Sequence, residues 1–262
     1  MVPYNGAEGV LIREEIVSEH DSTVMTRNAY GARCLNTPDV LFVDIDFDTT
    51  MSRRGVLLAT VVLIGIALMV GWAMRSGLLA FILSVLVLLM TIAGANLVRH
   101  ALVRSRGGPS NRRKRIDAYL RAHPHAHLRL DRTPAGLRVL AMHKTFTPRE
   151  PAVAECFKAL GADPMYAHMY VNQNCFRARV SAKPWRIGSC SHLRPRPGTW
   201  PIKSQHLPAR RQWVEAYEKA AQGYAACRYI ESLGPQRGTM ATRAVQALHD
   251  EWCRANSGLP IA

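Results

Sequence analysis

The sequence predicts an α+β fold with a mixed or antiparallel sheet and helices on one face. A two-helix transmembrane hairpin interrupts this fold, and a helical region follows it at the C-terminus. Three observations lead to this prediction. Short segments of alternating apolar and polar residues are interleaved with single amphipathic segments. Two long apolar segments follow each other in the first half of the chain, and the C-terminal part repeats apolar residues at helical spacing.

Residues 20–48 are predicted to form two short strands joined by a turn. The turn is expected over 35–39, where Asn, Pro and Asp favour it. The second strand, LFVDIDFD over 41–48, is rich in strand-forming residues. Because successive side chains of a strand point to opposite faces, its apolar residues would share one face and its aspartates the other. These aspartates are Asp44, Asp46 and Asp48.

Two apolar segments, 55–74 and 77–98, are predicted to form a transmembrane hairpin. Neither contains a charged residue, and only Arg75 and Ser76 separate them. A helix needs about 20 apolar residues to cross a hydrocarbon core about 30 Å thick, and both segments reach this length. Core helices of a soluble protein are rarely so uniformly apolar, which makes the hairpin the better interpretation.

The charges beside the hairpin predict its orientation. Arg53 and Arg54 precede the first segment, and several arginines with the run RRKR at 112–115 follow the second. The turn between the segments has a single Arg. By the positive-inside rule, both termini would be cytoplasmic. We therefore expect a multi-pass protein of the inner (plasma) membrane, with the lipid bilayer as its first partner.

Residues 99–111 are expected to be a flexible linker, because they include SRGGPSN. A short basic amphipathic helix is predicted over 112–124, where Pro124 would end it. Residues 126–146 alternate around the turn sequence TPAG, which predicts a β-hairpin.

A helix is predicted over 147–163, with Thr147 as its cap and Gly161 just beyond its end. Residues 174–188 are predicted to form a further strand. Helix is predicted over 208–254, with one break at Gly234 and Pro235. The expected division of the chain is therefore 1–52 and 112–207 for the cytoplasmic α+β domain, 53–98 for the transmembrane hairpin, 99–111 for the linker and 208–262 for the helical region.

The net charge of +15 is unevenly distributed along the chain. Residues 1–50 carry 3 Lys and Arg against 9 Asp and Glu, whereas residues 99–262 carry 28 against 10. Such asymmetry favours an anionic partner, which could be a nucleotide, a nucleic acid or anionic lipid headgroups. The alternative is a solvated positive surface beside a membrane.

The aspartates of 41–48 are candidate metal ligands. Carboxylates at alternate positions of a strand stand about 7 Å apart on one face. Pairs of this kind can hold Mg²⁺ or Mn²⁺ for phosphoryl transfer. The alternative is an acidic sheet face that is neutralised by Arg177 and Arg179 on a neighbouring strand.

The segment FRARVSAKPWR is a candidate anion-binding segment. Arginine side chains suit phosphate groups, and the face of Trp185 could stack on a base. Arg138 and His143 of the predicted hairpin would add to the same face. The predicted phosphate- or anion-binding residues are Arg138, Arg177, Arg179, Lys183 and Arg186. The alternative is a structural charge ladder with a buried Trp.

Common catalytic and metal motifs are absent from the sequence. It contains no P-loop, dinucleotide fingerprint, H-E-x-x-H or G-x-S-x-G. The six cysteines would face a reducing compartment, so disulfides are not expected. Cys190 and His192 form the only close Cys/His pair, and a zinc site would need two further ligands from elsewhere.

Several blocks together resemble a family of uncharacterised bacterial proteins, some of them described only as transmembrane proteins. The blocks are LFVDIDFD, RTPAGLRVLAMHKTF, CFRARVSAKPWR, YAACRYIESLG and VQALHDEWCRANSGLP. They lie within residues 40–48 and 126–262. The resemblance implies a membrane location and no particular activity.

A more remote similarity is to the catalytic core of archaeo-eukaryotic-type primases. That core has a D-x-D strand and a Gly-containing strand that ends in a histidine. The resemblance implies metal binding by Asp44 and Asp46 and a catalytic role for His143. His143 lies seven residues after Gly136, which is further than in the primase motif, and no clear third carboxylate follows.

Two functions follow from these observations. The first is an integral inner-membrane protein whose basic cytoplasmic α+β domain binds an anionic ligand or a partner. The second is a divalent-metal-dependent enzyme of phosphoryl or nucleotidyl transfer, of remote primase-like type. Direct pairing between the aspartates and arginines would favour the first, and an open pocket lined by both would favour the second.

Overall fold

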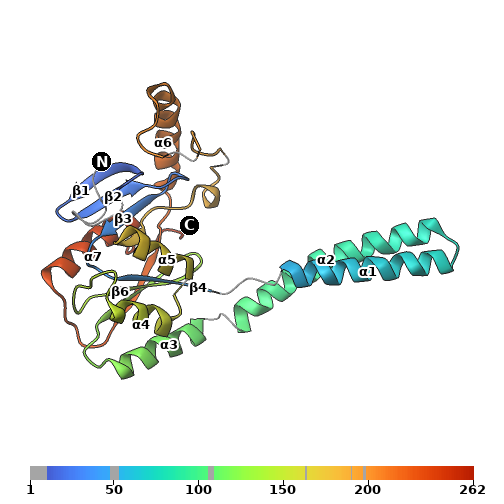
Figure 1. Cartoon of the computed structure of the whole chain (residues 1–262), viewed down its shortest axis with the longest axis horizontal. Helices are drawn as coiled ribbons and strands as arrows, with labels where there is room; N and C mark the ends of the chain where they lie inside the picture. The colour runs from blue at the N-terminus through green and yellow to red at the C-terminus, as the bar shows by residue number, and fades with distance from the viewer. Residues whose placement is uncertain (1–10, 48–52, 106–108, 163, 190, 197–198) are drawn as a thin grey trace. The chain divides into compact units, whose positions relative to one another are not determined.

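The chain divides into two compact units, which we call the α+β unit (1–46 and 113–262) and the hairpin unit (47–112). The computed structural model in Figure 1 describes residues 11–47, 53–105, 109–162, 164–189, 191–196 and 199–262. Asp48, one of the predicted metal ligands, and Cys190 lie outside these residues.

The α+β class is confirmed, and the strands form two antiparallel sheets where one sheet was predicted. We call them the first and the second sheet. The first has the order β1-β2-β3-β7, with strands β1 (Glu15–His20), β2 (Thr23–Arg27), β3 (Arg33–Thr37) and β7 (Phe176–Arg179). The second has the order β4-β6-β5-β8, with strands β4 (Phe42–Asp46), β6 (Gly136–Ala141), β5 (Leu128–Arg132) and β8 (Arg228–Leu233).

The N-terminal part forms four strands where two were predicted. The additional turn is built around Asn28, whose side-chain oxygen accepts hydrogen bonds from the backbone N–H groups of Tyr30 (3.2 Å) and Ala32 (3.0 Å). An Asn side chain that bonds backbone groups in this way stabilises a turn without Pro. The predicted turn at 35–39 is partly wrong, because β3 continues to Thr37.

The hairpin predicted over 126–146 is confirmed. β5 and β6 pair antiparallel, and Thr133 closes the turn by accepting a hydrogen bond from the N–H of Gly136 on its side-chain oxygen (3.0 Å). A Cβ atom at Gly136 would lie 2.0 Å from the carbonyl oxygen of Ile45. Glycine therefore allows β6 to lie tightly against β4, the strand that carries the aspartates.

The helices of the α+β unit partly follow the prediction. They are α3 (Pro109–Ala122), α4 (Pro151–Leu160), α5 (Pro164–Gln173), α6 (Leu207–Ala221) and α7 (Met240–Cys253). α4 begins after Glu150 rather than at Thr147, and ends with Gly161 in a left-handed conformation (φ 73°), as its sequence predicts. The strand predicted over 174–188 is shorter, and a 3₁₀ turn occupies Pro184–Arg186.

The prediction of helix over 208–254, with one break at Gly234 and Pro235, is wrong in its middle. Residues Arg228–Leu233 form strand β8, which pairs antiparallel with β5. The paired residues include Leu128 with Leu233 and Asp131 with Tyr229. Pairing with a distant strand therefore decides the conformation of this segment against its local helical pattern.

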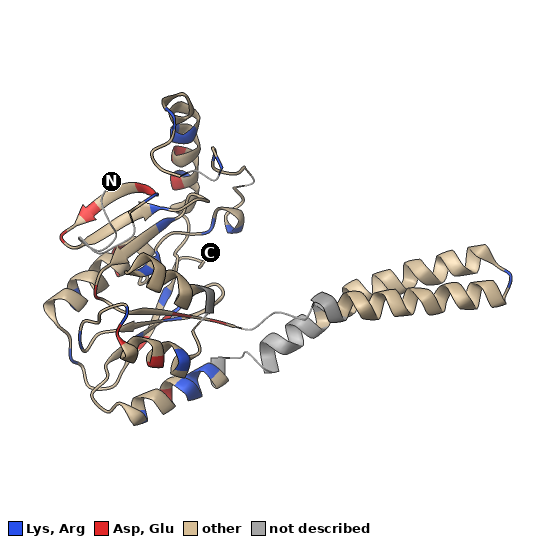
Figure 2. Ribbon diagram, in the orientation of Figure 1, with Lys and Arg blue, Asp and Glu red and all other residues tan. Residues whose placement is uncertain are grey.

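The hairpin unit consists of helices α1 (Arg53–Ala73) and α2 (Gly77–Ser105). α2 extends beyond the predicted span, so that 99–105 is helical rather than part of a linker. Val56–Ala73 and Gly77–Gly94 are long and apolar enough to cross a membrane, and only 11% and 0% of these positions are buried. A core helix of a soluble protein would be mostly buried. Figure 2 shows a basic position at the turn between the two helices, where the sequence has Arg75.

The two helices of the hairpin approach each other closely near their turn. A Cβ atom at Gly71 would lie 2.3 Å from the Cβ of Ala80, whereas a Cβ at Gly65 would meet nothing within 4 Å. Small residues allow membrane helices to pack at short distance. Gly71 is therefore a point of close contact between the helices, and Gly65 is not.

Contacts between β4, β6 and β7 join the two sheets of the α+β unit. Arg138 of β6 donates a hydrogen bond from Nη1 to the carbonyl oxygen of Arg179 in β7 (2.8 Å). The hydroxyl of Tyr166 on α5 contacts the carbonyl oxygens of Arg177 in β7 and Phe42 in β4. This junction carries most of the candidate functional residues.

Candidate anion-binding pocket

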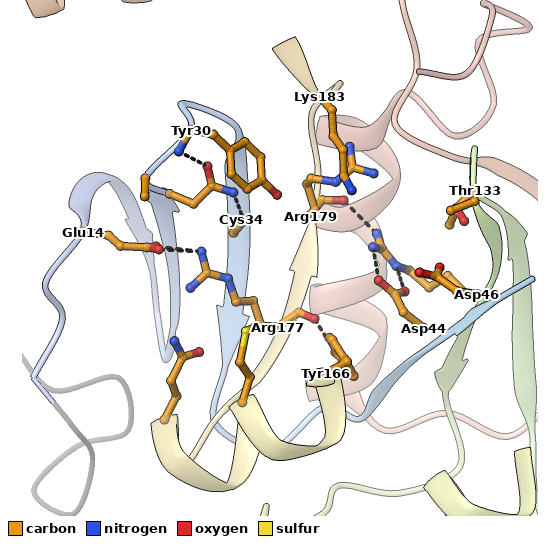
Figure 3. A pocket seen from close by; sticks show the side chains of 16 residues that line it. Glu14, Tyr30, Cys34, Asp44, Asp46, Thr133, Tyr166, Arg177, Arg179 and Lys183 are labelled. Atoms are coloured by element: carbon orange, nitrogen blue, oxygen red, sulfur yellow. Dashed lines mark hydrogen bonds and ion pairs between the residues drawn. The ribbon is translucent and has the colours of Figure 1, made fainter. Parts of the chain in front are cut away.

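A cavity of about 390 Å³ opens at the junction of the two sheets. Figure 3 shows side chains from both sheets and from α5 around it. It is lined by seven charged residues, which are Glu14, Asp44, Asp46, Arg138, Arg177, Arg179 and Lys183, and by further residues that include Tyr30, Cys34, Thr133 and Tyr166. Six of the predicted site residues therefore lie around one pocket. They come from segments that are distant in the sequence.

Asp44 and Arg138 form a bidentate ion pair at one wall of the pocket. They lie opposite each other in the antiparallel β4–β6 pair. The Nε and Nη2 atoms of Arg138 donate to Oδ1 and Oδ2 of Asp44 at 2.7 and 2.9 Å. Burial would raise the pKa of Asp44, but the charge and hydrogen bonds of Arg138 outweigh it, so the pKa lies below its usual value. Both oxygens of Asp44 are thus bound to a guanidinium rather than free for a metal ion.

Arg177 is paired with Glu14, a residue that the sequence analysis did not consider. Its Nη2 atom donates to Oε1 and Oε2 of Glu14 at 2.9 and 2.7 Å. Glu14 also accepts a hydrogen bond from the hydroxyl of Thr26 (2.6 Å). Arg177 therefore pairs with a residue of the segment before β1, whereas the charge of Arg179 helps to lower the pKa of Asp44 on the acidic strand.

Arg179 and Lys183 remain as cations that face the pocket without a salt bridge to a carboxylate in the described residues. Arg179 donates from Nη1 to the carbonyl oxygen of Ser181 at 2.7 Å. The pKa of Lys183 is lowered by burial and by the charges of Arg179 and Arg186, although Asp46 and Asp44 act in the opposite direction. Mutual repulsion of this kind is relieved when an anion binds between the cations. Figure 3 shows Arg179 and Lys183 beside each other.

Arg186 and Trp185 lie next to this pocket rather than in its lining. Trp185 is 57% exposed, which excludes the buried Trp of the structural alternative, and its ring meets that of Tyr30 edge-on at 5.2 Å between centroids. Tyr30 also lines a second cavity of about 130 Å³ together with Trp185. The Nη1 atom of Arg186 is buried and has no hydrogen-bond acceptor among the described residues.

The two remaining candidate residues, Asp46 and His143, differ in whether they line the pocket. Asp46 is exposed and lines the pocket, two residues along the strand from Asp44. His143 does not line the pocket; its Nδ1 atom lies 3.4 Å from the carbonyl oxygen of His127, and its ring meets Phe146 edge-on. Burial lowers the pKa of His143. The structure therefore brings Asp44 and Asp46 together with the cations but leaves His143 outside.

Several polar residues of the pocket wall were not predicted from the sequence, and they include Glu14, Tyr30 and Tyr166. Glu14 and Tyr30 come from the N-terminal segment, where the sequence indicated strands and an acidic composition but no site residue before Asp44. Tyr166 comes from α5, a helix that was not predicted. The available signal was the acidic pair Glu14 and Glu15, which matches the arginines of FRAR in charge but cannot be matched in register from sequence.

Comparison of the chain with family models, with curated proteins and with solved structures finds no match. The resemblance to bacterial transmembrane proteins and the more remote resemblance to primases therefore stay predictions. The pocket and the two apolar helices are therefore the features that bear on function.

Proposed function

We propose that the protein is an integral inner-membrane protein whose cytoplasmic α+β unit binds a small phosphate-bearing molecule in the pocket between its two sheets. The observation that supports this most directly is the position of Arg179 and Lys183. Both face the cavity, and neither forms a salt bridge with a carboxylate within the described part of the chain. The other two cations of the lining are already paired with Asp44 and Glu14.

The membrane part of the proposal rests on the hairpin unit. Its helices expose large apolar side chains along their length, as Leu58 (69% exposed) and Phe81 (67%) illustrate. Such surfaces are stable in a bilayer and unfavourable in water. The arginines that flank the two helices support the cytoplasmic position of both termini.

The size of the pocket supports a small ligand over a nucleic acid or a lipid surface. About 390 Å³ lies near the lower end of the range for small-molecule sites. The exposed ring of Trp185 and the neighbouring Tyr30 offer an aromatic surface next to the cations. A nucleotide, with a planar base beside its phosphates, is therefore the ligand class that these features fit best.

Metal-dependent phosphoryl or nucleotidyl transfer is the second candidate function. The position of Asp44 and Asp46 at the same pocket as the cations favours it. The ion pair between Asp44 and Arg138 opposes it, because Mg²⁺ or Mn²⁺ would have to displace a guanidinium held by two hydrogen bonds. We therefore propose ligand binding as the main function and keep metal-dependent catalysis as the second candidate.

The test is calorimetric titration of the full chain in detergent micelles with inorganic phosphate, pyrophosphate and a nucleoside triphosphate, each with and without Mn²⁺. The variant Arg179→Met/Lys183→Met should weaken binding by about 100-fold or more, because each lost hydrogen bond to a charged group is worth about 1.5–3 kcal/mol. Lys219→Met, an exposed position of α6, is the control for loss of one positive charge.

The outcomes separate the two functions. Metal-independent binding that is lost in the double variant supports the binding protein. Binding that requires Mn²⁺ and is lost in Asp46→Asn supports the transferase. Equal affinity in the wild type, the double variant and the control would show that the pocket is not the site.

A further inference from the structure

Three buried side chains with metal-binding atoms meet behind the anion-binding pocket. Cys227 lies just before β8, and His249 and Cys253 lie on α7; none has any solvent exposure. Their ligand atoms all lie within 4.8 Å of one another. The Sγ atom of Cys227 is 3.8 Å from Nε2 of His249.

The 3.8 Å separation of sulfur and nitrogen is close to that in a zinc centre. Zn–S bonds of about 2.3 Å and Zn–N bonds of about 2.0–2.1 Å in a tetrahedron separate sulfur and nitrogen by about 3.6 Å. Two features hold the three residues in place. His249 and Cys253 are four residues apart and so share one face of α7. The backbone N–H of Ala226 donates to the carbonyl oxygen of Cys253 (2.9 Å), which attaches the start of β8 to the end of α7.

The Nδ1 atom of His249 has a carboxylate neighbour, as the second ring nitrogen of a metal-bound histidine often does. Its Nδ1 atom lies 3.4 Å from Oδ1 of Asp250, and that carboxylate is held by Nη2 of Arg129 at 2.7 Å. A carboxylate at Nδ1 orients the ring so that Nε2 points at a metal ion. In this structure Nε2 points toward Cys227 and Arg138.

The charges around the cluster would be balanced with a divalent ion bound. Two thiolates and a neutral imidazole neutralise Zn²⁺, and the nearby guanidinium of Arg138 is already neutralised by Asp44. Asp131 is a further buried carboxylate in this region. Neither of its oxygens accepts a hydrogen bond from the described residues, although Nη2 of Arg129 lies 3.5 Å from Oδ1 as an ion pair. Asp131 lies directly opposite Arg138 in the β5–β6 pair, so both side chains share the face of the second sheet on which Arg138 meets His249.

We propose that Cys227, His249 and Cys253 bind one thiophilic transition-metal ion, Zn²⁺, at this buried site. The remaining position of the tetrahedron is left for water, or for Asp131 if its carboxylate moves toward the three ligand atoms, among which it does not lie here. The site does not depend on the proposed anion binding, although Arg138 contacts both: its Nη1 atom lies 3.3 Å from Nε2 of His249, and its Nε and Nη2 atoms hold Asp44. Without a metal ion, His249 would instead accept a hydrogen bond from Arg138, and the thiols would keep only long contacts, that of Cys227 with His249 and that of Cys253 with the carbonyl oxygen of Arg179.

The experiment measures metal content, because a buried site is loaded as the chain folds. The full chain is produced in medium containing either Zn²⁺ or Co²⁺, purified in detergent under reducing conditions, and analysed for metal per chain. Co²⁺ bound to thiolates gives charge-transfer absorption that reports the sulfur ligands. We expect one metal ion per chain, thiolate–cobalt absorption, and a fall in melting temperature after removal of the metal by a chelator.

Variants test which residues bind. Cys227→Ser and His249→Asn should lose the metal, and Asp250→Asn should weaken its binding by about 10–100-fold. Asp131→Asn should change the cobalt spectrum only if Asp131 is the fourth ligand. Cys156→Ser, at a buried cysteine of α4 outside the cluster, is the matched control and should keep the metal.

Three results would overturn the proposal. The first is a wild-type chain without metal whose melting temperature is unaffected by Zn²⁺ or chelator, a measurement that does not depend on whether the variants fold. The second is equal metal content in the Cys227→Ser variant and the control. The third is a disulfide between Cys227 and Cys253 in the reduced preparation.

Discussion

Replacing Arg138 by methionine should lower the free energy of unfolding of the α+β unit by about 4 kcal/mol. Arg138 is 1% exposed, and it joins the two sheets through Asp44 on β4 and the carbonyl oxygen of Arg179 on β7. Methionine has a similar length but offers no donor and no charge. The substitution therefore leaves an acceptor on each sheet without its partner.

The magnitude follows from the two contacts. Removing one partner of a buried ion pair costs about 3–5 kcal/mol. The side chain of Asp44 is 27% exposed, so water can hydrate part of its charge, and the lower value of about 3 kcal/mol applies. The unpaired carbonyl of Arg179 adds about 1 kcal/mol. The sum is a large share of the total stability of about 5–15 kcal/mol that is usual for a domain.

The assay is equilibrium unfolding by urea of the full chain in detergent micelles, followed by tryptophan fluorescence. Four of the five tryptophans belong to the α+β unit. The control is Arg121→Met at an exposed position of α3, which should change the free energy of unfolding by no more than about 0.5 kcal/mol. A loss below about 1 kcal/mol for Arg138→Met would refute the reasoning.

The same ion pair predicts a pH dependence. Because Arg138 lowers the pKa of Asp44 in the folded state, the pair stabilises the fold fully above the ordinary carboxyl pKa of about 3.9. This contribution is lost as the pH falls through the lowered pKa of the folded state. The difference in unfolding free energy between the wild type and Arg138→Met should therefore shrink below about pH 4. A difference that is constant from pH 7 to pH 3 would contradict this.

Three other substitutions test separate parts of the structure. Tyr166→Phe should lower the free energy of unfolding by about 1–2 kcal/mol in the same assay, because two buried carbonyl oxygens lose a hydroxyl donor; an unchanged value would count against the contact. Gly71→Leu should lower the melting temperature of the hairpin helices, measured by circular dichroism in micelles, whereas Gly65→Leu should not; equal effects would refute the packing at Ala80. Trp185→Ala should weaken binding of a nucleoside triphosphate by about 10-fold without changing that of pyrophosphate, since stacking is worth about 1–3 kcal/mol per base; equal losses for both ligands would exclude stacking.

Local sequence patterns were sufficient to predict several helices and strands. The two apolar helices, the hairpin of β5 and β6 and the glycine-terminated helix α4 depend on residues close together in the chain. Hydrophobic periodicity and turn chemistry act over this range. β8 was missed because a strand at this position depends on its pairing with β5, about a hundred residues earlier.

The candidate pocket shows the same division between features that local sequence predicts and features that depend on distant contacts. Asp44 and Arg138 were recognised as residues with suitable chemistry, but their pairing required the register of β4 with β6. The partner of Arg177 proved to be Glu14, which is 163 residues away in the chain. Charge composition predicts that such side chains need partners, and only the register decides which ones meet.

The sequence by itself determined the apolar hairpin, the α+β class and the kinds of side chain that could bind an anion. Each of these depends on composition or on short-range periodicity. The tertiary structure decided that the strands form two sheets, that Arg179 and Lys183 face a shared pocket and that Cys227 meets His249 and Cys253. The physical reason is that these arrangements depend on contacts between distant segments, and the packing of the whole unit selects those contacts.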